Sequence, residues 1–413
     1  MKSEAAWETR RLGEVADDCR YGYTASATDR PEGPRFLRIT DIVGDLDWES
    51  VPFVEASERD AERYLLKDGD IVIARTGANV GVSAHIMNPP PAVFASYLVR
   101  FRFDRAKVSD RFIGYVLKSP MWANYVQAAH TGSGQPQLNA TLMKGFEFSL
   151  PPLDEQQRIA QVLGALDSKI EVNRCLAKTL EKIAATLFKA RFVNFAEHDD
   201  LIESEPGPIP RGWSWEPLSS IAEILGGGTP KTDVAGYWDG DIPWISVKDT
   251  VPGPYVISVD RCITEDGRKA ARLTTYPANT AVITARGTVG NVALMSESMT
   301  LNQSCYALRG NNGVGQFFLF HLLRRAVAVL QSRAHGSVFS TITRATFDSV
   351  MAAIPPQEEI NQFEELAQPI FARIHAAMRE ANELAEVRDV LLPRLISGEI
   401  RVSSNMGSAQ EEP

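Results

Sequence analysis

The chain has 413 residues, of which 44% are hydrophobic, and this amount of apolar material is enough for two or more domains that each have a core. No stretch approaches the roughly 18 consecutive apolar residues of a membrane span, and the first residues lack the apolar run of a signal peptide. We therefore expect a soluble, cytoplasmic protein with no membrane partner. The formal net charge of −9 argues against a polycation that coats nucleic acid without selectivity.

The acidic charge is concentrated at the end of the chain. Residues 356–413 hold 5 basic and 11 acidic side chains, a net charge of −6, whereas the remainder is close to neutral. Near neutrality is compatible with DNA binding, because a DNA reader needs basic residues only on its contact face.

Two halves of the chain resemble each other at an offset of slightly more than 200 residues. Trp7–Ala16 matches Trp213–Ala222, and Pro151-Pro152 matches Pro355-Pro356. A period of this length is typical of a duplicated domain, since the repeats of solenoid proteins span only about 20–50 residues. The sequence therefore predicts that the protein is built from two similar domains.

Each half has a pattern of short strands that changes to a helical pattern after its Pro-Pro pair. Acidic residues follow each pair, and the dipole of a helix favours acids in its first turn. We predict an α+β protein with five segments in chain order: a first domain at 1–153, a helix at 154–197, a second domain at 198–355, a helix at 356–402 and a flexible tail at 403–413.

Apolar residues recur at alternating spacings of four and three in both predicted helices, which is the pattern of a coiled-coil seam. The register is the same in both copies, which favours an antiparallel pair of helices with one domain at each end and an approximate two-fold axis. The alternative is that each stripe packs only on its own domain. The predicted seam residues are Ile159, Leu163, Leu166, Ile170, Leu180, Leu187, Ile370, Ile374, Leu384 and Leu391.

Three residues predict interruptions of these helices. Pro369 removes a backbone donor inside the second seam, and Gly164 lies in the corresponding part of the first, so we expect a short first piece and a longer second piece in each helix. Pro393 predicts an end or a kink of the last helix. A helix of ~38 residues spans about 57 Å, and the second helix must return, so the two chain ends should meet near the first domain.

Signals of catalysis and of metal binding are scarce. The sequence has no phosphate-binding GxxxxGK[ST] loop, no HExxH, no GxSxG and no acidic metal cluster, and its four cysteines lack ligand spacing. We expect these cysteines to be small buried hydrophobic residues. Asn88-Pro89-Pro90-Pro91 is similar to the loop that holds a flipped adenine, but Pro91 replaces the aromatic residue, so we expect a rigid turn.

Polar loops occur at corresponding positions of the two halves and carry the side chains that donate to phosphates and base edges. Ordinary solvated loops are the alternative, but the paired positions favour DNA contacts. The candidate DNA-binding residues are Arg75, Thr76, Asn79, Gln135, Gln137 and Asn139 in the first domain, and Lys248, Arg286, Thr288, Ser340, Thr343 and Arg344 in the second.

The chain resembles the specificity subunit of type I restriction and modification enzymes over nearly its whole length. Gly227–Pro230 and Tyr237–Ile245 are similar to the target-recognition domain of that family, and Glu155–Ala160 and Leu391–Ile400 are similar to its spacer helices. The second helix departs from the pattern with Glu358–Asn361, and the first domain's opening loop is less typical than that of the second.

The resemblance implies a non-catalytic subunit that binds double-stranded DNA. Each domain would read half of a bipartite target, and the helices would set the spacer and dock two modification subunits. These partners would carry S-adenosylmethionine and methylate adenine N6, and two restriction subunits would hydrolyse ATP with Mg²⁺. The chain itself would bind no cofactor and no metal.

Two other functions remain open from the residues alone. A self-sufficient DNA methyltransferase would need its own S-adenosylmethionine site, and methylation by the purified chain would establish it. A coiled-coil scaffold that does not bind DNA would show no salt-sensitive binding to duplexes.

Overall fold

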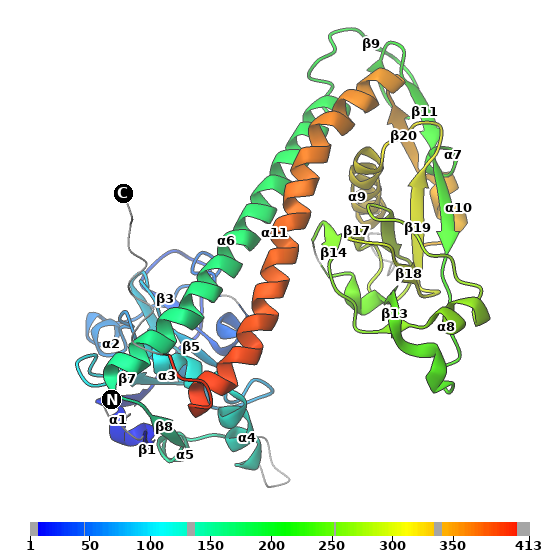
Figure 1. Ribbon diagram of the computed structural model, residues 1–413. Coiled ribbons are helices and arrows are strands. Elements are labelled where there is room, and N and C mark those ends of the chain that lie inside the picture. Colours follow the sequence, from blue (N-terminus) through cyan, green and yellow to red (C-terminus); the bar gives the residue numbers. More distant parts are fainter. Residues whose placement is uncertain (1–6, 45, 130–136, 252, 334–340, 403–413) are drawn as a thin grey trace, which may run out of the picture. The chain divides into compact units, whose positions relative to one another are not determined.

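The computed structural model describes residues 7–44, 46–129, 137–251, 253–333 and 341–402 (Figure 1). The chain divides into two compact units: unit 1 is Met1–Ser168 with Ala385–Pro413, and unit 2 is Lys169–Leu384. Each unit contains one mixed α and β domain together with part of both long helices, which agrees with the predicted α+β class. The division passes through the helices, whereas the prediction treated them as separate segments.

The domain of unit 1 is organised around an antiparallel sheet with the strand order β2-β7-β4-β5. The central strands β4 and β7 consist mainly of β-branched, leucine and phenylalanine residues, and nearly all of their side chains are buried. The elements of this domain are β1 Glu8–Arg11, α1 Leu12–Val15, β2 Asp18–Tyr21, β3 Arg35–Leu37, η1 Ile39–Ile42, α2 Glu58–Arg63, β4 Ile71–Ala74, β5 Ser83–His85, β6 Ala92–Phe94, β7 Leu98–Arg102, α3 Asp110–Val116, α4 Pro120–Ala128, α5 Ala140–Lys144 and β8 Glu147–Leu150.

The domain of unit 2 repeats this sheet as β12-β19-β16-β17 and adds the short strand β14 at its edge. Helix α9 packs on the sheet, mainly through apolar side chains that join its core. The elements of this unit, apart from the long helices, are β9 Leu201–Ile202, β10 Ile209–Pro210, β11 Ser214–Pro217, α7 Leu218–Ile221, β12 Ala222–Gly226, η2 Ala235–Tyr237, β13 Trp238–Ile245, η3 Val247–Asp249, β14 Tyr255–Val256, β15 Cys262–Ile263, α8 Glu265–Ala270, β16 Ala281–Thr284, β17 Val292–Met295, β18 Thr300–Leu301, β19 Cys305–Gly310, α9 Gln316–Arg333, α10 Arg344–Ser349 and β20 Met351–Ile354.

Strand register shows that the sequence repeat is also a structural repeat. Ile71 of β4 faces Phe101 of β7, and Ala281 of β16 faces Leu308 of β19, so both pairs have the same place in their sheets. The parallel pair of β3 with β6 likewise corresponds to β13 with β18, and β1 with β8 corresponds to β11 with β20. The two domains therefore share one fold, as the repeat predicted.

A tryptophan, half-buried in the first domain and buried in the second, connects each domain to the start of a long helix. The Trp7 indole donates to Glu155 at 3.0 Å, and the Trp213 indole donates to Glu359 at 3.2 Å. Both glutamates lie in the first turn of a long helix, where the dipole also favours a negative charge. In unit 1 the guanidinium of Arg401 also donates a hydrogen bond to Glu155, at 2.9 Å. The two ends of the described chain therefore meet in unit 1, as expected.

The two long helices are α6, Leu153–Phe192, and α11, Gln357–Ser397. Both are continuous, so the predicted breaks at Gly164 and Pro369 are wrong, and Pro393 does not end the last helix. Each helix ends five residues before the predicted end of its segment, at 192 instead of 197 and at 397 instead of 402.

Tertiary packing explains why these helices continue. Pro369 is exposed, and the neighbouring side chains of Ala367 and Phe371 are fully buried in the core of unit 2, which holds both sides of the proline in one helix. Gly164 lies beside Tyr115, whose hydroxyl donates to Asp167 at 2.7 Å three residues further along the helix and so ties this part of the helix to the domain. Packing therefore overrides local propensity at both positions.

The helices are antiparallel within each unit. In unit 1, Arg388 of α11 donates to Asp167 of α6 at 2.9 Å, and in unit 2 Lys169 of α6 lies 3.3 Å from Glu380 of α11. All ten predicted seam residues are at least half-buried. The fully buried ones are Ile159, Leu163, Ile170 and Ile374, and the half-buried ones are Leu166, Leu180, Leu187, Ile370, Leu384 and Leu391.

Both interpretations of the helical stripes hold in part. Leu163 shares a core with Leu392 of the other helix and also with Phe112 of the domain. Buried phenylalanines outside the predicted seam, including Phe188 and Phe192 on α6, fill the space between the helix pair and α9. The helices pair with each other and also close the cores of the domains.

His321 on α9 is buried among phenylalanine rings, and its Nε2 has no hydrogen-bond partner in the described part of the chain. Burial lowers its pKa to about 3, and Arg324 adds to this. Because the pKa is depressed on folding, the stabilising effect of the neutral ring is present above pH 6.5 and is lost as the pH falls towards the folded value.

We therefore expect unit 2 to lose about 2 kcal/mol of stability from this residue between pH 7.5 and pH 5. Burial raises the pKa of Glu364 to about 7 and so acts in the opposite direction over this range, although the backbone N–H groups of Phe318 and Phe317 oppose that rise. The measurement is the pH dependence of hydrogen exchange in α9 for His321→Leu and for the parent, both of which retain Glu364. An identical pH dependence in both proteins would contradict the prediction.

Within the described ranges, no helix is both long enough and apolar enough to cross a bilayer. The expectation that all four cysteines are buried is correct only for Cys305, since Cys19 and Cys262 are half-buried and Cys175 is exposed. Cys175 lies on the outer face of α6, and its thiol contacts Glu171 one turn earlier.

Candidate nucleic-acid interface

The turn between β4 and β5 carries three of the candidate DNA-binding residues of the first domain. Arg75 follows β4 directly, and its backbone is fixed on both sides, because its N–H donates to Tyr97 at 3.0 Å and its carbonyl accepts from Leu138 at 2.8 Å. Gly77 closes the turn with a φ of +81°, a conformation that glycine adopts without strain. Thr76 and Asn79 are half-buried in the same turn.

The segment before α5 lies against this turn. An isolated bridge pairs Gln137 with Thr76, and the Gln137 side chain is exposed. Asn139 is the N-cap of α5, since its Oδ1 accepts from the Leu142 N–H at 2.9 Å. Its amide oxygen therefore has a structural role, and only the NH₂ group is left to donate. Gln135 lies outside the described residues.

Two tyrosines beside this turn are missing from the sequence-based set. The Tyr21 ring lies under the Arg75 guanidinium, with 5.0 Å between the guanidinium carbon and the ring centroid. Tyr97 is 58% exposed at the turn between β6 and β7, next to the Arg75 backbone. Tyrosines are common in and next to short strands, so the sequence held no signal that separates these two rings from core residues.

The second domain places its candidates around the equivalent turn, between β16 and β17. Arg286 and Thr288 are exposed there, on either side of Gly287, which has a φ of +80°. A Cβ at Gly287 would lie 3.5 Å from the Val247 side chain, so the 3-10 helix η3 packs beside the turn. The exposed Lys248 belongs to η3 and therefore joins the same surface.

The segment before α10 completes this surface. Ile342 donates its N–H to the Ala285 carbonyl at 2.9 Å, which brings the exposed Thr343 and Arg344 to the same turn. Thr343 is the N-cap of α10, and its N–H donates to the Thr346 hydroxyl at 3.0 Å. Ser340 lies outside the described residues.

Corresponding hydrogen bonds give a residue-by-residue match of the two surfaces. Arg75 bonds to Tyr97 and Leu138, and Ala285 bonds in the same way to Ser304 and Ile342. Arg75 therefore occupies the position of Ala285, and Tyr97 occupies that of Ser304. By the same match Thr76 corresponds to Arg286 and Asn139 to Thr343. Strand pairing adds one more pair: Tyr21 of β2 faces β7 as Gly226 of β12 faces β19, so Tyr21 corresponds to Gly226. The two turns therefore have the same backbone frame, by which we mean the same set of backbone hydrogen bonds to the neighbouring segments, but the side chains differ at each of these positions.

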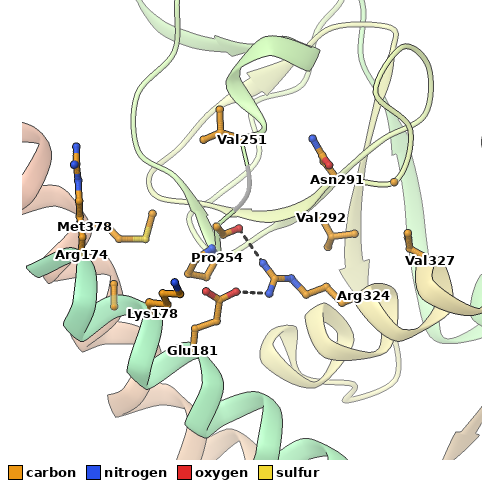
Figure 2. Close-up of a pocket in the computed structure, with 13 residues that line it drawn as sticks. Arg174, Lys178, Glu181, Val251, Pro254, Asn291, Val292, Arg324, Val327 and Met378 are labelled. Carbon is orange, nitrogen blue, oxygen red and sulfur yellow. Dashed lines mark hydrogen bonds and ion pairs between the residues drawn. The ribbon is translucent and has the colours of Figure 1, made fainter. Parts of the chain in front are cut away.

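A groove of about 540 Å³ lies within unit 2, between α6, α11 and the edge of the sheet (Figure 2). Arg324 is fixed there by an ion pair with Glu181, by a hydrogen bond to the Gly253 carbonyl at 3.0 Å and by the Phe320 ring 4.4 Å away. The α6 side of the groove carries the cations Arg174 and Lys178, and the opposite side is mainly apolar. The other lining residues are Ala177, Val251, Pro254, Gly290, Asn291, Val292, Val327 and Met378. This groove fits an anionic or amphipathic partner.

No group of three or more His, Cys, Asp or Glu side chains that could hold a metal ion occurs in the part of the chain that the structure describes. Asn88 of the Asn-Pro-Pro-Pro sequence has a φ of +42°, and its N–H donates to Asp68 at 2.9 Å, as expected for a rigid turn. The polar surfaces around the two turns are therefore the strongest candidates for a functional site.

A family model described as the type I restriction modification DNA specificity domain matches this chain twice, at residues 4–182 and 210–386. These matches cover most of the chain and coincide with the two structural repeats.

Similar proteins and structures agree with this match. The specificity subunit of the type I restriction enzyme MjaIX from Methanocaldococcus jannaschii is 27% identical over 71% of this chain and 70% of its own length. The HindI specificity subunit from Haemophilus influenzae is 24% identical over 82% of this chain and 88% of its length. A crystal structure of a type I restriction-modification S subunit from M. genitalium shares the fold, with a TM-score of 0.64, 14% identity and coverage of 96% of this chain and 98% of that one.

Proposed function

Since this chain belongs to the family of type I restriction modification DNA specificity domains, we propose that it reads a bipartite DNA target, with one half-site for each domain. Its relatives are specificity subunits, so it is a non-catalytic component of a restriction-modification complex. The observation that carries the proposal is the repeated turn and its neighbouring segment. One backbone frame presents Arg75 and Tyr97 in the first domain and Ala285 and Ser304 in the second.

Identical frames with different side chains are what two readers of different sequences require. Base contacts need side chains in fixed positions, and the backbone hydrogen bonds at each turn provide this fixation. Differences among Arg, Thr, Asn and Gln change which base edge is complementary. We propose that the long helices α6 and α11 set the number of unread bases between the two half-sites.

Apolar side chains on the outer faces of the long helices support docking of partner subunits. Val172 and Ile183 on α6 are 60% and 45% exposed, and Val387 and Val390 on α11 are 47% and 60% exposed. Exposed apolar residues at helical spacing are typical of a surface that a partner helix covers. We propose that two modification subunits bind along these faces, and that the cationic groove of unit 2 adds charge complementarity (Figure 2).

The proposal assigns all chemistry to the partner subunits. The modification subunits would carry S-adenosylmethionine and methylate adenine, and two restriction subunits would use ATP with Mg²⁺. This chain would contribute binding and orientation on double-stranded DNA and hold no cofactor.

The test is a comparison of half-site variants in the complex reconstituted with modification subunits, on the target found by methylation-aware sequencing of the source genome with and without the gene. We expect each lost base contact to cost ~1–3 kcal/mol in one half-site only, with Arg75→Ala and Arg286→Ala affecting different halves. Lys107→Ala and Lys269→Ala, exposed cations of the same two domains, are matched controls with no expected effect on selectivity. The mass of the complex gives the number of modification subunits.

Two outcomes would contradict the proposal. Absence of salt-sensitive duplex binding by the complex would indicate a scaffold, and methylation by the purified chain alone would indicate a self-sufficient methyltransferase.

A further inference from the structure

The side chain of Arg75 is held on an aromatic ring. Its guanidinium lies over the Tyr21 ring, and no described carboxylate forms an ion pair with it. Because the Arg75 backbone is bonded at both its N–H and its carbonyl, the starting point of the side chain is also fixed. A cation–π contact of this kind restrains the guanidinium and leaves its N–H groups able to donate elsewhere.

Tyr21 is itself fixed in place. It ends β2, where it pairs with Val99 of β7, and its hydroxyl accepts from the Ala140 N–H at 3.0 Å. Ala140 is the first residue of α5, directly after the capping residue Asn139. The ring is therefore attached at both ends, to the sheet and to a helix terminus, and it is 39% exposed at the same surface as Arg75.

We propose that Arg75 reads a guanine in the half-site of the first domain and that Tyr21 is the positioning residue for it. This inference rests on the proposed function and names one base contact within it. Guanine presents two acceptors, O6 and N7, side by side in the major groove, and the planar fork of an arginine donates to both. No other base offers two acceptors at this edge, so the contact selects guanine.

A base contact explains this geometry better than a phosphate contact does. A phosphate can be bound by a mobile cation, because charge alone supplies most of the interaction. Selectivity between bases instead requires donors that are held in place, and the Tyr21 ring restrains the Arg75 guanidinium. The neighbours Thr76 and Gln137 are neutral and polar, as expected where base edges are contacted.

The second domain has no equivalent of this pair. Gly226 replaces Tyr21, and Ala285 replaces Arg75, while its arginine, Arg286, lies one residue later in the turn. The inference is therefore confined to the first half-site, and the second half-site serves as an internal control.

The experiment replaces each guanine of the first half-site in turn by 7-deazaguanine, which keeps base pairing but has no N7 acceptor. The reconstituted complex with modification subunits is used throughout. We expect 7-deazaguanine at one position to weaken binding of the parent about 5-fold or more, and to have no effect on binding of the Arg75→Ala variant. Tyr21→Phe keeps the ring but loses the bond to Ala140, so it should retain most of the parent's penalty, whereas Tyr21→Leu should lose most of it. Substitutions in the second half-site should affect all these proteins equally.

Two results would overturn the inference. One is a first half-site in which no guanine shows a penalty that depends on Arg75. The other is an Arg75→Ala variant that weakens binding to specific and scrambled duplexes equally and reduces the salt dependence, since this indicates a phosphate contact. In both cases the parent still binds its target selectively, whereas failure of the proposed function would leave no selective binding at all.

Discussion

Replacing Asp70 by alanine is expected to lower the free energy of unfolding of unit 1 by about 3–5 kcal/mol, because it removes the buried carboxylate that is bonded to Arg102 and lies close to Arg100. The Asp70 side chain is 1% exposed at the start of β4. It accepts two hydrogen bonds from Arg102, both at 2.7 Å, and one from the Lys67 N–H at 2.8 Å.

The second arginine makes the loss larger. Arg100 is 2% exposed, is bonded to Asp18 and lies 4.0 Å from Asp70. Burial lowers the pKa of Arg100, and the neighbouring Arg102 lowers it further, so the two cations already oppose each other. Without Asp70 this repulsion has less compensation in a region that excludes water.

The measurement is native-state hydrogen exchange, which separates the two units. We expect faster exchange in β4 and β7 of the Asp70→Ala variant and unchanged exchange in β16 and β19. Asp68→Ala is the matched control. The Asp68 carboxylate is 47% exposed beside the similarly exposed Arg105, so its loss should lower the free energy of unfolding by less than about 1 kcal/mol.

The second domain indicates a compensating variant. The positions of Asp70 and Arg100 correspond to Thr280 and Ala307, so the same frame exists there without this ion pair. We expect Asp70→Thr combined with Arg100→Met to recover part of the loss, because it also removes the more buried of the two cations, whereas Arg102 is 29% exposed and can reach water. Equal losses in the single and the double variant would contradict this account.

The sequence predicted the features of the fold that depend on periodicity. The duplication, the two long helices and their seams follow from spacing, which side-chain geometry imposes directly. The interruptions at Gly164 and Pro369 were wrong, because the propensity of a single residue is weaker than burial of its neighbours, here Phe371 and Ala367. The division of the chain into units that share both helices depends on long-range contacts and has no local signal.

The candidate interface was predictable in composition but not in arrangement. Arg75 and Gln137 are more than 60 residues apart, and their segments are brought together by the Thr76–Gln137 bridge and by the hydrogen bond from the Leu138 N–H to the Arg75 carbonyl. The structural role of Asn139 as a helix cap and the position of Tyr21 under Arg75 depend on strand register and on the place where α5 begins. Polar composition alone does not distinguish a capping side chain from a free one.

Inserting seven residues into both long helices is expected to abolish methylation of the native target and to create activity on a target with a longer spacer. A heptad between Ser168 and Lys169 and another between Leu384 and Ala385 lie where the two units divide. Each adds about 10.5 Å of helix and turns the following residues by only about 20°, so both seams keep their register. At ~3.4 Å per base pair, the spacer should grow by up to about 3 base pairs.

A five-residue insertion at the same two places is the control, because it adds similar length but rotates the following helix by about 140°. That rotation moves residues such as Ile170 out of the seam, so we expect the five-residue variant to be inactive on every spacer. Methylation-aware sequencing of cells that carry each variant reports both half-sites and the spacer together. If the heptad variant methylates the native target at the parent's rate, helix length does not set the spacer. If its half-sites change along with the spacer, the two domains do not read independently of the helices.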